Sequence, residues 1–439
     1  MLRLLEVQAV LVRGEIRPLG VEPEWCDAEV LRRLRRRTLA RLRDAVAPVD
    51  AATLGRFLPA WQGVGEQIDG PDRLMEAVLQ LEGLTASWSQ LDRVLLPARV
   101  PGYRSADLDM LAATGRVVWV GLGSLGFRDG RVALYRRERI SELYGRDAVE
   151  AQTEGIHRVL TEHLHQRGAC FLMELAQAAE AAGCIVAKEH FEAAIWDLVW
   201  TGQVTNDTFE PLRNLAGGTR SRRRGRESSL AGGHWSLVSD LVGETSDTER
   251  LLARSQMLLE RYGLVSREVV QSEAIPGGFG PIYRVLKQME EGGQVRRGWF
   301  VEGLSGAQFA LAGAVDRMRS ARMDEVPVDG WSETDIRVLA AADPANPCGS
   351  LLPWPDAAGG KALKRSAGAW IILVAGKPVL YLSAGGKGLT SIPCSFSEEG
   401  GELPLALSAL QQIPRTGRRR MLIQTIDGES ALPASAHRG

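Results

Sequence analysis

The sequence predicts an α+β protein that is mainly α-helical, built as a tandem array of winged-helix units with a C-terminal β-barrel-like module. Three observations predict this fold: a helix-to-strand pattern that occurs three times without a gap, a helix-turn-helix before its third copy, and a strand-rich composition towards the C-terminus. The copies are LDMLAATGRVVWVG at 108–121, IWDLVWTGQVTNDT at 195–208 and LKQMEEGGQVRRGW at 286–299.

A glycine ends the helix in each copy, and a valine begins the strand two residues later. A glycine here can adopt the left-handed conformation that satisfies the last helix carbonyls and lets the chain reverse into a wing. Because the glycines are spaced by 87 and 91 residues, the pattern fits a tandem array of winged-helix units. The glycines are Gly115, Gly202 and Gly293, and the valines are Val117, Val204 and Val295.

Residues 1–150 are expected to hold a basic helical segment and the first winged-helix unit. The pattern of residues 2–22 favours short strands, and DAEVLRRLRRRTLARLRDAV then keeps apolar residues at helical spacing among seven arginines. Two interpretations of this helix remain open, a solvated basic face or a helix that follows nucleic-acid phosphates. The second interpretation assigns nucleic-acid binding to Arg32, Arg35, Arg36 and Arg37.

Residues that typically begin or end helices and turns locate the elements of the first unit. One helix is predicted to begin at Pro71 and to end at Gly83, and a second to begin at Ser87 and to end before Pro97. An Asp-Gly pair at 129–130 lies between two alternating apolar segments, which indicates a β-hairpin.

The second unit is assigned to residues 151–216, with helices predicted at 155–166, 171–182 and 188–200. Residues 217–234 follow as a flexible loop rich in arginine and without apolar periodicity. His157 and His163 are six residues apart and face different sides of the predicted helix, so no metal site is expected.

The third unit, residues 235–330, carries the helix-turn-helix. One helix ends at Gly263, Ser266 caps the next, a Gly/Pro turn covers 276–281, and a third helix runs through Glu291. In a winged-helix unit the later helix lies in a groove while the wing crosses phosphates. This assigns nucleic-acid binding to Arg284 and Lys287 on the helix and to Arg296 and Arg297 on the wing. A further helix is predicted at 305–320.

Residues 331–439 are expected to form the β-barrel-like module with a terminal helix. DPANPCGSLLPWP is too rich in proline for a helix, and AGAWIILVAGKPVLYL indicates two strands on either side of Gly376. A helix at about 402–412 and a strand at 421–426 follow.

Composition limits the class of protein. The 439 residues are 45% hydrophobic and 24% charged with a net charge of −1, so any nucleic-acid surface must come from local basic clusters. No apolar run reaches membrane-spanning length and no signal peptide is evident, so a cytoplasmic protein without a membrane partner is expected. The five cysteines lack CxxC spacing, which argues against a disulfide framework or zinc site; neither metal nor cofactor is expected.

A set of short segments, in order along nearly the whole chain, resembles the region after the motor in bacterial large helicase-related (Lhr) proteins. They include WQGV, LQLEGL, LLPARV, LLERYGLVSRE, PGGFGPIYRVL, RRGWFVEGLSGAQFA and DPANPCGSLLPWP. The resemblance implies a winged-helix array with a β-barrel-like module, attached in the family to an ATP-driven 3′-to-5′ DNA translocase that unwinds RNA:DNA hybrids. It also implies DNA or an RNA:DNA hybrid as partner and assembly into a homo-oligomer. A separately encoded Lhr motor is a further expected partner, because the motor motif is missing from this sequence.

The motor itself is not expected in this chain. No GxxxxGK[ST] motif occurs, and GGKG at 385–388 has Tyr381 where the leading glycine should stand and Gly388 where the magnesium-binding hydroxyl should stand. The chain is therefore expected to lack ATPase activity and to be separated from its helicase half.

The architecture of the Lhr region is also similar to that of AlkZ-type DNA glycosylases, which carry Gln-x-Gln or Gln-x-Asp. This chain has Gln80-Leu81-Glu82, where an amide and a carboxylate could position water against the anomeric carbon of an extruded nucleotide. The alternative is that both are polar residues of a surface helix end. Two function classes remain open: a nucleic-acid-binding and oligomerising accessory region of a DNA-repair helicase, and a DNA glycosylase that excises uracil or alkylated bases.

Overall fold

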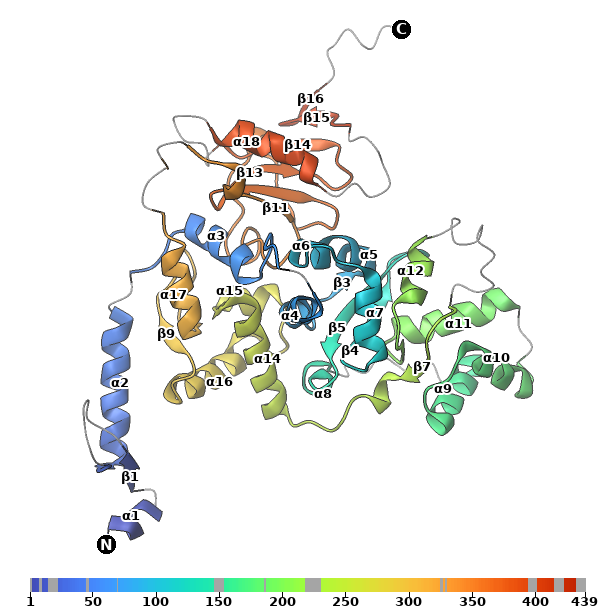
Figure 1. The fold of residues 1–439 in the computed structure, drawn as a ribbon, viewed down its shortest axis with the longest axis horizontal. Helices are drawn as coiled ribbons and strands as arrows, with labels where there is room; N and C mark the ends of the chain where they lie inside the picture. Colours follow the sequence, from blue (N-terminus) through green and yellow to red (C-terminus); the bar gives the residue numbers. More distant parts are fainter. Residues whose placement is uncertain are drawn as a thin grey trace.

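The structure of the 439-residue chain is a computed structural model in which helices and short sheets form a mixed α/β body (Figure 1). It describes residues 2–7, 10–14, 23–44, 47–68, 70–145, 154–184, 187–217, 230–323, 327, 330–393, 401–413 and 422–431. Helix α2 projects from one side of the body, and a six-stranded sheet forms its upper part in the view of Figure 1. Among the described residues, no helix combines the length and the apolar character that crossing a bilayer requires.

The first unit has the winged-helix topology, because its third strand lies between the first and the second in the order β3-β5-β4. Its elements are α4 (Pro71–Leu81), β3 (Ala86–Ser87), α5 (Trp88–Gln90), the π-helical turn η1 (Leu91–Leu95), α6 (Leu96–Arg99), α7 (Ser105–Ala113), β4 (Val117–Ser124) and β5 (Gly130–Arg136), followed by α8 (Ile140–Leu143).

The second unit repeats this topology with a shorter first strand. Cys170 forms a bridge with Trp235 and takes the place of that strand, while β6 and β7 pair antiparallel. The arginine-rich stretch 218–229, which makes up most of the predicted loop at 217–234, lies outside the described residues. The elements are α9 (Gly155–Arg167), α10 (Leu172–Ala181), α11 (Lys188–Trp200), β6 (Val204–Asn206), α12 (Glu210–Gly217), β7 (Trp235–Leu237) and η2 (Val238–Asp240).

The third unit has the strand order β8-β10-β9. The helix predicted at 305–320 is wrong at its start, because Phe309 belongs to a strand and pairs with Val265 on one side and Arg297 on the other. Phe309 is fully buried there and helps to close the core of the unit, which local helix propensity cannot express. The elements are α14 (Asp247–Tyr262), β8 (Leu264–Val265), α15 (Arg267–Ser272), α16 (Phe279–Glu291), β9 (Arg296–Gly298), β10 (Gln308–Ala310) and α17 (Ala312–Ser320).

The three repeated glycines end their helices in the same way, as predicted. Gly115, Gly202 and Gly293 have φ values of 69°, 70° and 76°. In each unit the glycine N–H donates to the carbonyl three residues back, and the next N–H donates to the carbonyl five residues back. This is the Schellman pair of hydrogen bonds, which turns the chain from the helix into the wing.

Two local predictions for the N-terminal part are wrong. Residues 2–7 form the helix α1 (Leu2–Val7) and not a strand, because Leu, Arg and Glu favour the helix. The strands β1 (Leu11–Gly14) and β2 (Glu24–Asp27) pair with each other, and helix α2 (Ala28–Asp44) follows them. The helix that begins near Ser87 continues through Pro97. It can do so because Pro97 falls in the first turn of α6, after a π-helical turn in which the Leu96 N–H donates to the Leu91 carbonyl.

The C-terminal strands form one sheet in the order β11-β12-β13-β14-β15-β16. The predicted strands on either side of Gly376 are confirmed as β12 and β13. The predicted barrel-like closure is not confirmed, because within the described residues β11 and β16 remain the two edge strands of an open sheet. Helix α18 covers β12 and β13. The elements are η3 (Glu333–Asp335), β11 (Ile336–Ala340), η4 (Ala358–Gly360), β12 (Trp370–Val374), β13 (Lys377–Leu382), β14 (Gly388–Ser391), α18 (Glu402–Ser408), η6 (Ala409–Gln412), β15 (Thr425–Ile426) and β16 (Glu429–Ser430).

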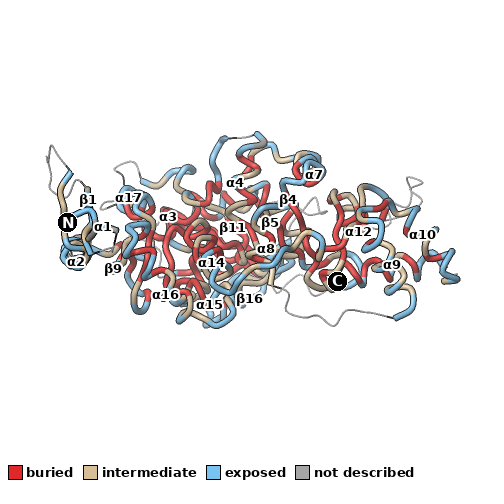
Figure 2. The backbone as a smooth tube through the Cα atoms, turned by 90° about the horizontal axis from the view of Figure 1, so that it is seen from below, coloured by how far each residue is buried: buried red, intermediate tan, exposed pale blue. Residues whose placement is uncertain are grey.

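The sheet of the first unit is buried on both faces, which makes it the centre of the array. Successive side chains of β4 point to opposite faces, so Trp119 joins a core shared with the second unit, while Val118 and Val120 join a core shared with the third. Figure 2 shows buried residues running through β5, β11 and α14, with α1 and α2 outside this centre. The three units are therefore packed on one another and are not separate beads on a chain.

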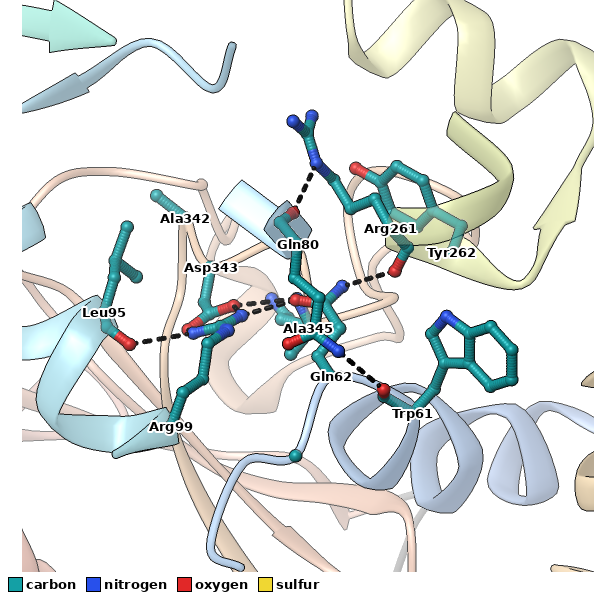
Figure 3. A network of polar contacts seen from close by, with 12 residues as sticks. Trp61, Gln62, Gln80, Leu95, Arg99, Arg261, Tyr262, Ala342, Asp343 and Ala345 are labelled. Atoms are coloured by element: carbon teal, nitrogen blue, oxygen red, sulfur yellow. Dashed lines mark hydrogen bonds and ion pairs between the residues drawn. The ribbon is translucent and has the colours of Figure 1, made fainter. Parts of the chain in front are cut away.

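A buried polar network joins the first unit, the third unit and the C-terminal sheet (Figure 3). Arg99 of α6 pairs with Asp343 through two hydrogen bonds of 2.7 and 3.1 Å, and both side chains are no more than 1% exposed. Arg99 also donates to Gln62, which follows α3 (Ala51–Trp61), and the Gln62 amide donates to the carbonyl of Arg261 on α14 at 3.1 Å.

Candidate nucleic-acid interface

Helix α16 of the third unit has the two faces that a groove-binding helix needs. Gly277 and Gly278, with φ values of 80° and 67°, turn the chain into the helix. Its apolar residues Ile282, Leu286 and Met289 are buried and join the core around α14. The opposite face exposes Arg284, Lys287 and Gln288, and neither basic side chain has a carboxylate partner in the described part of the chain. The structure thus places both predicted helix residues on one accessible face.

The corresponding helices of the other two units offer no such face. Helix α11 packs against the sheet of the first unit. A side chain on Gly121 of β4 would collide with the Val199 carbonyl, and one on Gly130 of β5 would collide with the Trp200 ring. On α7, Asp109 pairs with Arg213 and accepts the N–H of Phe209 at 2.8 Å. Within the residues described, the later helix of the third unit is therefore the one that exposes two basic residues on its open face, whereas α11 exposes a single lysine, Lys188.

The two predicted wing arginines lie in different environments. Arg297 donates to the Tyr283 hydroxyl at 3.0 Å and lies 3.6 Å from the Glu290 carboxylate, so it is held against α16. Arg296 is half-buried and pairs with none of the described carboxylates. Of the pair, Arg296 is the one whose charge is left free for a ligand.

The basic helix α2 lies against β9 of the third unit and not against the first unit. The chain that follows it is tied to the same wing, because the Val49 N–H donates to the Phe300 carbonyl at 2.8 Å and Val49 accepts from Glu302 at 2.9 Å. Arg33 pairs with Glu29. Three other arginines of the helix are exposed and have no partner among the described carboxylates, namely Arg32, Arg36 and Arg37, whereas the side chain of Arg35 lies outside the described residues.

A pocket of about 270 Å³, with both apolar and charged lining residues, lies at the end of α4. Gln80 donates from its amide to the Trp61 carbonyl at 2.9 Å (Figure 3), while its amide oxygen is buried and has no partner among the described residues. The guanidinium of Arg317 lies 5.3 Å from the centre of the Trp61 ring. The lining residues are Trp61, Glu76, Leu79, Gln80, Glu260, Leu311 and Arg317.

Glu260 is the carboxylate of this pocket that stands out chemically. Burial raises its pKa, and the neighbouring Arg139 and Arg136 at 3.7 and 3.6 Å oppose that rise. One of its oxygens is buried without a hydrogen-bond partner in the described chain. Sequence reasoning missed Glu260 because it lies 180 residues from Gln80 and carries no local signal.

The structure separates the two residues of the predicted catalytic pair. Gln80 lines the pocket, whereas Glu82 is 0% exposed and is not among the lining residues. The Glu82 carboxylate accepts the N–H of Arg136 at 2.7 Å and two hydrogen bonds from its guanidinium at 2.8 and 3.1 Å. Because Arg136 also approaches Glu260, Glu82 orients a cation at the edge of the pocket.

Known proteins resemble the regions that contain the first and third units. Two family models, both described as the winged-helix domain of large helicase-related protein, match residues 49–137 and 244–329. The chain carries Lhr-type winged-helix domains. A Mycolicibacterium smegmatis protein named Lhr helicase/probable uracil glycosylase is 36% identical over 452 residues, which cover 98% of this chain and 29% of that protein. An Escherichia coli protein named Lhr helicase/uracil glycosylase is 36% identical over 404 residues, which cover 83% of this chain and 26% of that protein.

The similarity lies in the C-terminal part of these Lhr proteins, and the chain spans less than a third of their length. Among solved structures, Streptomyces sahachiroi DNA glycosylase AlkZ matches with a TM-score of 0.47 and 12% identity, covering 86% of this chain and all of that one. The two matched Lhr domains contain the first and third units. Trp61 and Gln80 come from the first domain and Glu260 and Arg317 from the second, so the pocket lies between two Lhr-type winged-helix domains.

Proposed function

We propose that this chain is a nucleic-acid-binding accessory region of an Lhr-type DNA-repair helicase in the cytoplasm, and that it binds DNA through its third winged-helix unit. The observation that carries the proposal is the open face of α16, where Arg284 and Lys287 are exposed without carboxylate partners among the described residues. The corresponding helices α7 and α11 are covered or acidic, which leaves the third unit as the binding unit.

The basic surface extends from α16 over the wing to α2. Arg296 on β9 and Arg32, Arg36 and Arg37 on α2 supply further positive charge beside it. Arg297 contributes to the same wing while it is held by Tyr283 and Glu290, and the predicted role of Arg35 falls on a side chain outside the described residues. Such a track neutralises successive phosphates and needs no base contact, so it suits an RNA:DNA hybrid as well as duplex DNA.

The test compares two double variants for binding to duplex DNA at several salt concentrations. Arg284→Ala/Lys287→Ala is expected to flatten the slope of log K against log salt by about two units, roughly 0.9 per lost phosphate contact. The matched control is Arg104→Ala/Lys188→Ala, which removes two exposed cations, Arg104 at the N-cap of α7 and Lys188 at the start of α11, and is expected to leave the slope unchanged. Equal slopes for both variants would place the interface elsewhere.

Two partners complete this proposal. Self-association is proposed from the Lhr resemblance, which implies assembly into a homo-oligomer. Light scattering of the samples used for binding would show it as a mass above 47.8 kDa at micromolar concentration. The second partner is an Lhr-type motor, which would supply ATP-driven translocation.

A second candidate function is base excision, which the pocket between the two domains favours. Both similar Lhr proteins carry uracil glycosylase in their names. In this chain the pocket is lined by Gln80, whose buried amide oxygen has no partner among the described residues, and by Glu260, whose raised pKa suits a group that accepts a proton from an attacking water. Glu82 would act indirectly by holding Arg136 beside Glu260.

Base release from oligonucleotides that contain uracil or alkylated bases, followed by alkaline cleavage, tests this candidate. Gln80→Ala and Glu260→Gln are each expected to lower release by about 100-fold or more, the usual range for a general base, with DNA affinity unchanged. Glu76→Gln is the matched control, since Glu76 lines the same pocket but pairs with Arg73 at 2.8 Å. If Glu82→Gln alone abolishes release, the acceptor is Glu82; if the unaltered chain releases no base, this candidate is wrong.

A further inference from the structure

The wing of the third unit presents a tryptophan to solvent. Trp299 directly follows β9, and its side chain is 59% exposed. An indole of this size normally buries most of its surface, so its exposure on the wing of the third unit leaves apolar surface that a ligand could cover.

The backbone around Trp299 is held firmly, so the indole is presented from a fixed position. The next residue, Phe300, is buried, and its N–H donates to the Gln308 side chain at 2.9 Å while its carbonyl accepts from Val49 at 2.8 Å. On the other side of Trp299, Gly298 leaves room for the Phe300 ring. A Cβ added at Gly298 would lie 3.0 Å from that ring. A rigid anchor loses little conformational entropy when a ligand covers it.

The charges near Trp299 select the chemistry of that ligand. Arg296 lies three residues before it, and α2, with its exposed Arg32, Arg36 and Arg37, lies against the same wing. A protein partner that covered the indole would also have to supply several carboxylates to these arginines, because burying unpaired charge is costly. A nucleic-acid strand brings phosphates and flat bases together, which is the combination that aromatic and basic residues bind in single-strand proteins.

We propose that Trp299 stacks on an unpaired base, and that Arg296 and the arginines of α2 hold the phosphates of the same strand. This inference rests on the proposed function of the third unit and adds the substrate class, because the face of a base is accessible only where the strand is single or splayed. The third unit would thereby bind the junction between duplex and single strand. Helix α16 would contact the duplex, and Trp299 would contact the unpaired strand.

The test measures the affinity of the full chain for single-stranded and duplex oligonucleotides. Trp299→Ala is expected to weaken single-strand binding by about 5- to 30-fold and duplex binding by less than about 2-fold, without changing the salt slope. Trp299→Phe keeps a flat ring and is expected to restore most of the single-strand affinity. An oligonucleotide carrying 2-aminopurine is expected to lose its fluorescence change on binding to Trp299→Ala and to keep it with Trp299→Phe.

The control is Phe127→Ala on the wing of the first unit. Phe127 is 85% exposed, but the guanidinium of Arg128 already lies 5.6 Å from the centre of its ring, and α7 beside it offers no basic face. Equal losses for Phe127→Ala and Trp299→Ala, or no loss for either, would overturn the stacking proposal while nucleic-acid binding by the third unit stands. A chain that binds neither single strands nor duplexes would overturn both proposals.

Discussion

Replacing Asp343 with alanine is expected to lower the free energy of unfolding by about 3–5 kcal/mol, because it leaves the Arg99 guanidinium buried without its carboxylate. Both side chains are no more than 1% exposed, and Asp343 also accepts the N–H of Ala345 at 2.8 Å. The pair joins α6 of the first unit to the segment after β11. Its loss should therefore also loosen the C-terminal sheet from the winged-helix array. Urea-induced unfolding measures the first effect, and protection of the β11–β14 amides from hydrogen exchange measures the second.

Two further variants separate the buried charge from other effects of Asp343→Ala. Asp107→Ala breaks the pair with Arg104, which is 75% exposed, and is expected to cost no more than about 1 kcal/mol. The double variant Arg99→Met/Asp343→Leu removes both charges and is expected to recover much of the lost stability. If Asp343→Ala and Asp107→Ala destabilise the chain equally, the buried pair does not hold the parts together.

Gly55→Ala is expected to destabilise the chain by about 3 kcal/mol, at the upper end of the usual cost of overpacking. The added Cβ would lie 2.0 Å from the Gly376 carbonyl oxygen, which belongs to the turn between β12 and β13. A backbone atom cannot rotate away as a side chain can, and Gly376 itself has a φ of 82° that restricts its movement. The chain can accommodate the methyl group only by separating α3 from the C-terminal sheet.

Gly313→Ala on α17 is the matched control for this prediction. An added Cβ at Gly313 meets nothing within 4 Å, so the change should be neutral or stabilise the chain by up to about 1 kcal/mol through helix propensity. The two glycine variants are thus expected to shift the unfolding midpoint in opposite directions. A shift of the same sign for both would show that the contact between α3 and the sheet can relax.

Much of the local structure was predictable because it depends on residues close together in the chain. The left-handed glycines at 115, 202 and 293 and the Ser266 cap follow from backbone geometry within one turn. The three helices of the second unit were predicted to within a residue or two for the same reason. Where prediction failed, a distant partner decided the outcome: Phe309 became a strand because β8 and β9 lie on either side of it.

The candidate site shows the same division. Sequence alone assigned Arg284, Lys287, Arg296 and Arg297 to nucleic-acid binding, and it named Gln80 with Glu82. It could not show that α2 lies against β9, that Glu260 shares a pocket with Gln80, or that Glu82 is buried against Arg136, since these contacts join residues from about 50 to more than 250 positions apart.

By itself the sequence determined the repeated winged-helix units, their helix ends and the relationship to Lhr proteins. Only the tertiary structure decided which of three similar helices is open to a ligand. The reason is steric and electrostatic: α11 packs one face on β4 and exposes a single lysine, Asp109 on α7 is paired with Arg213, and α16 keeps two basic side chains on its open face. Local periodicity is the same in all three helices, so packing between units and not pattern within them determines where nucleic acid can bind.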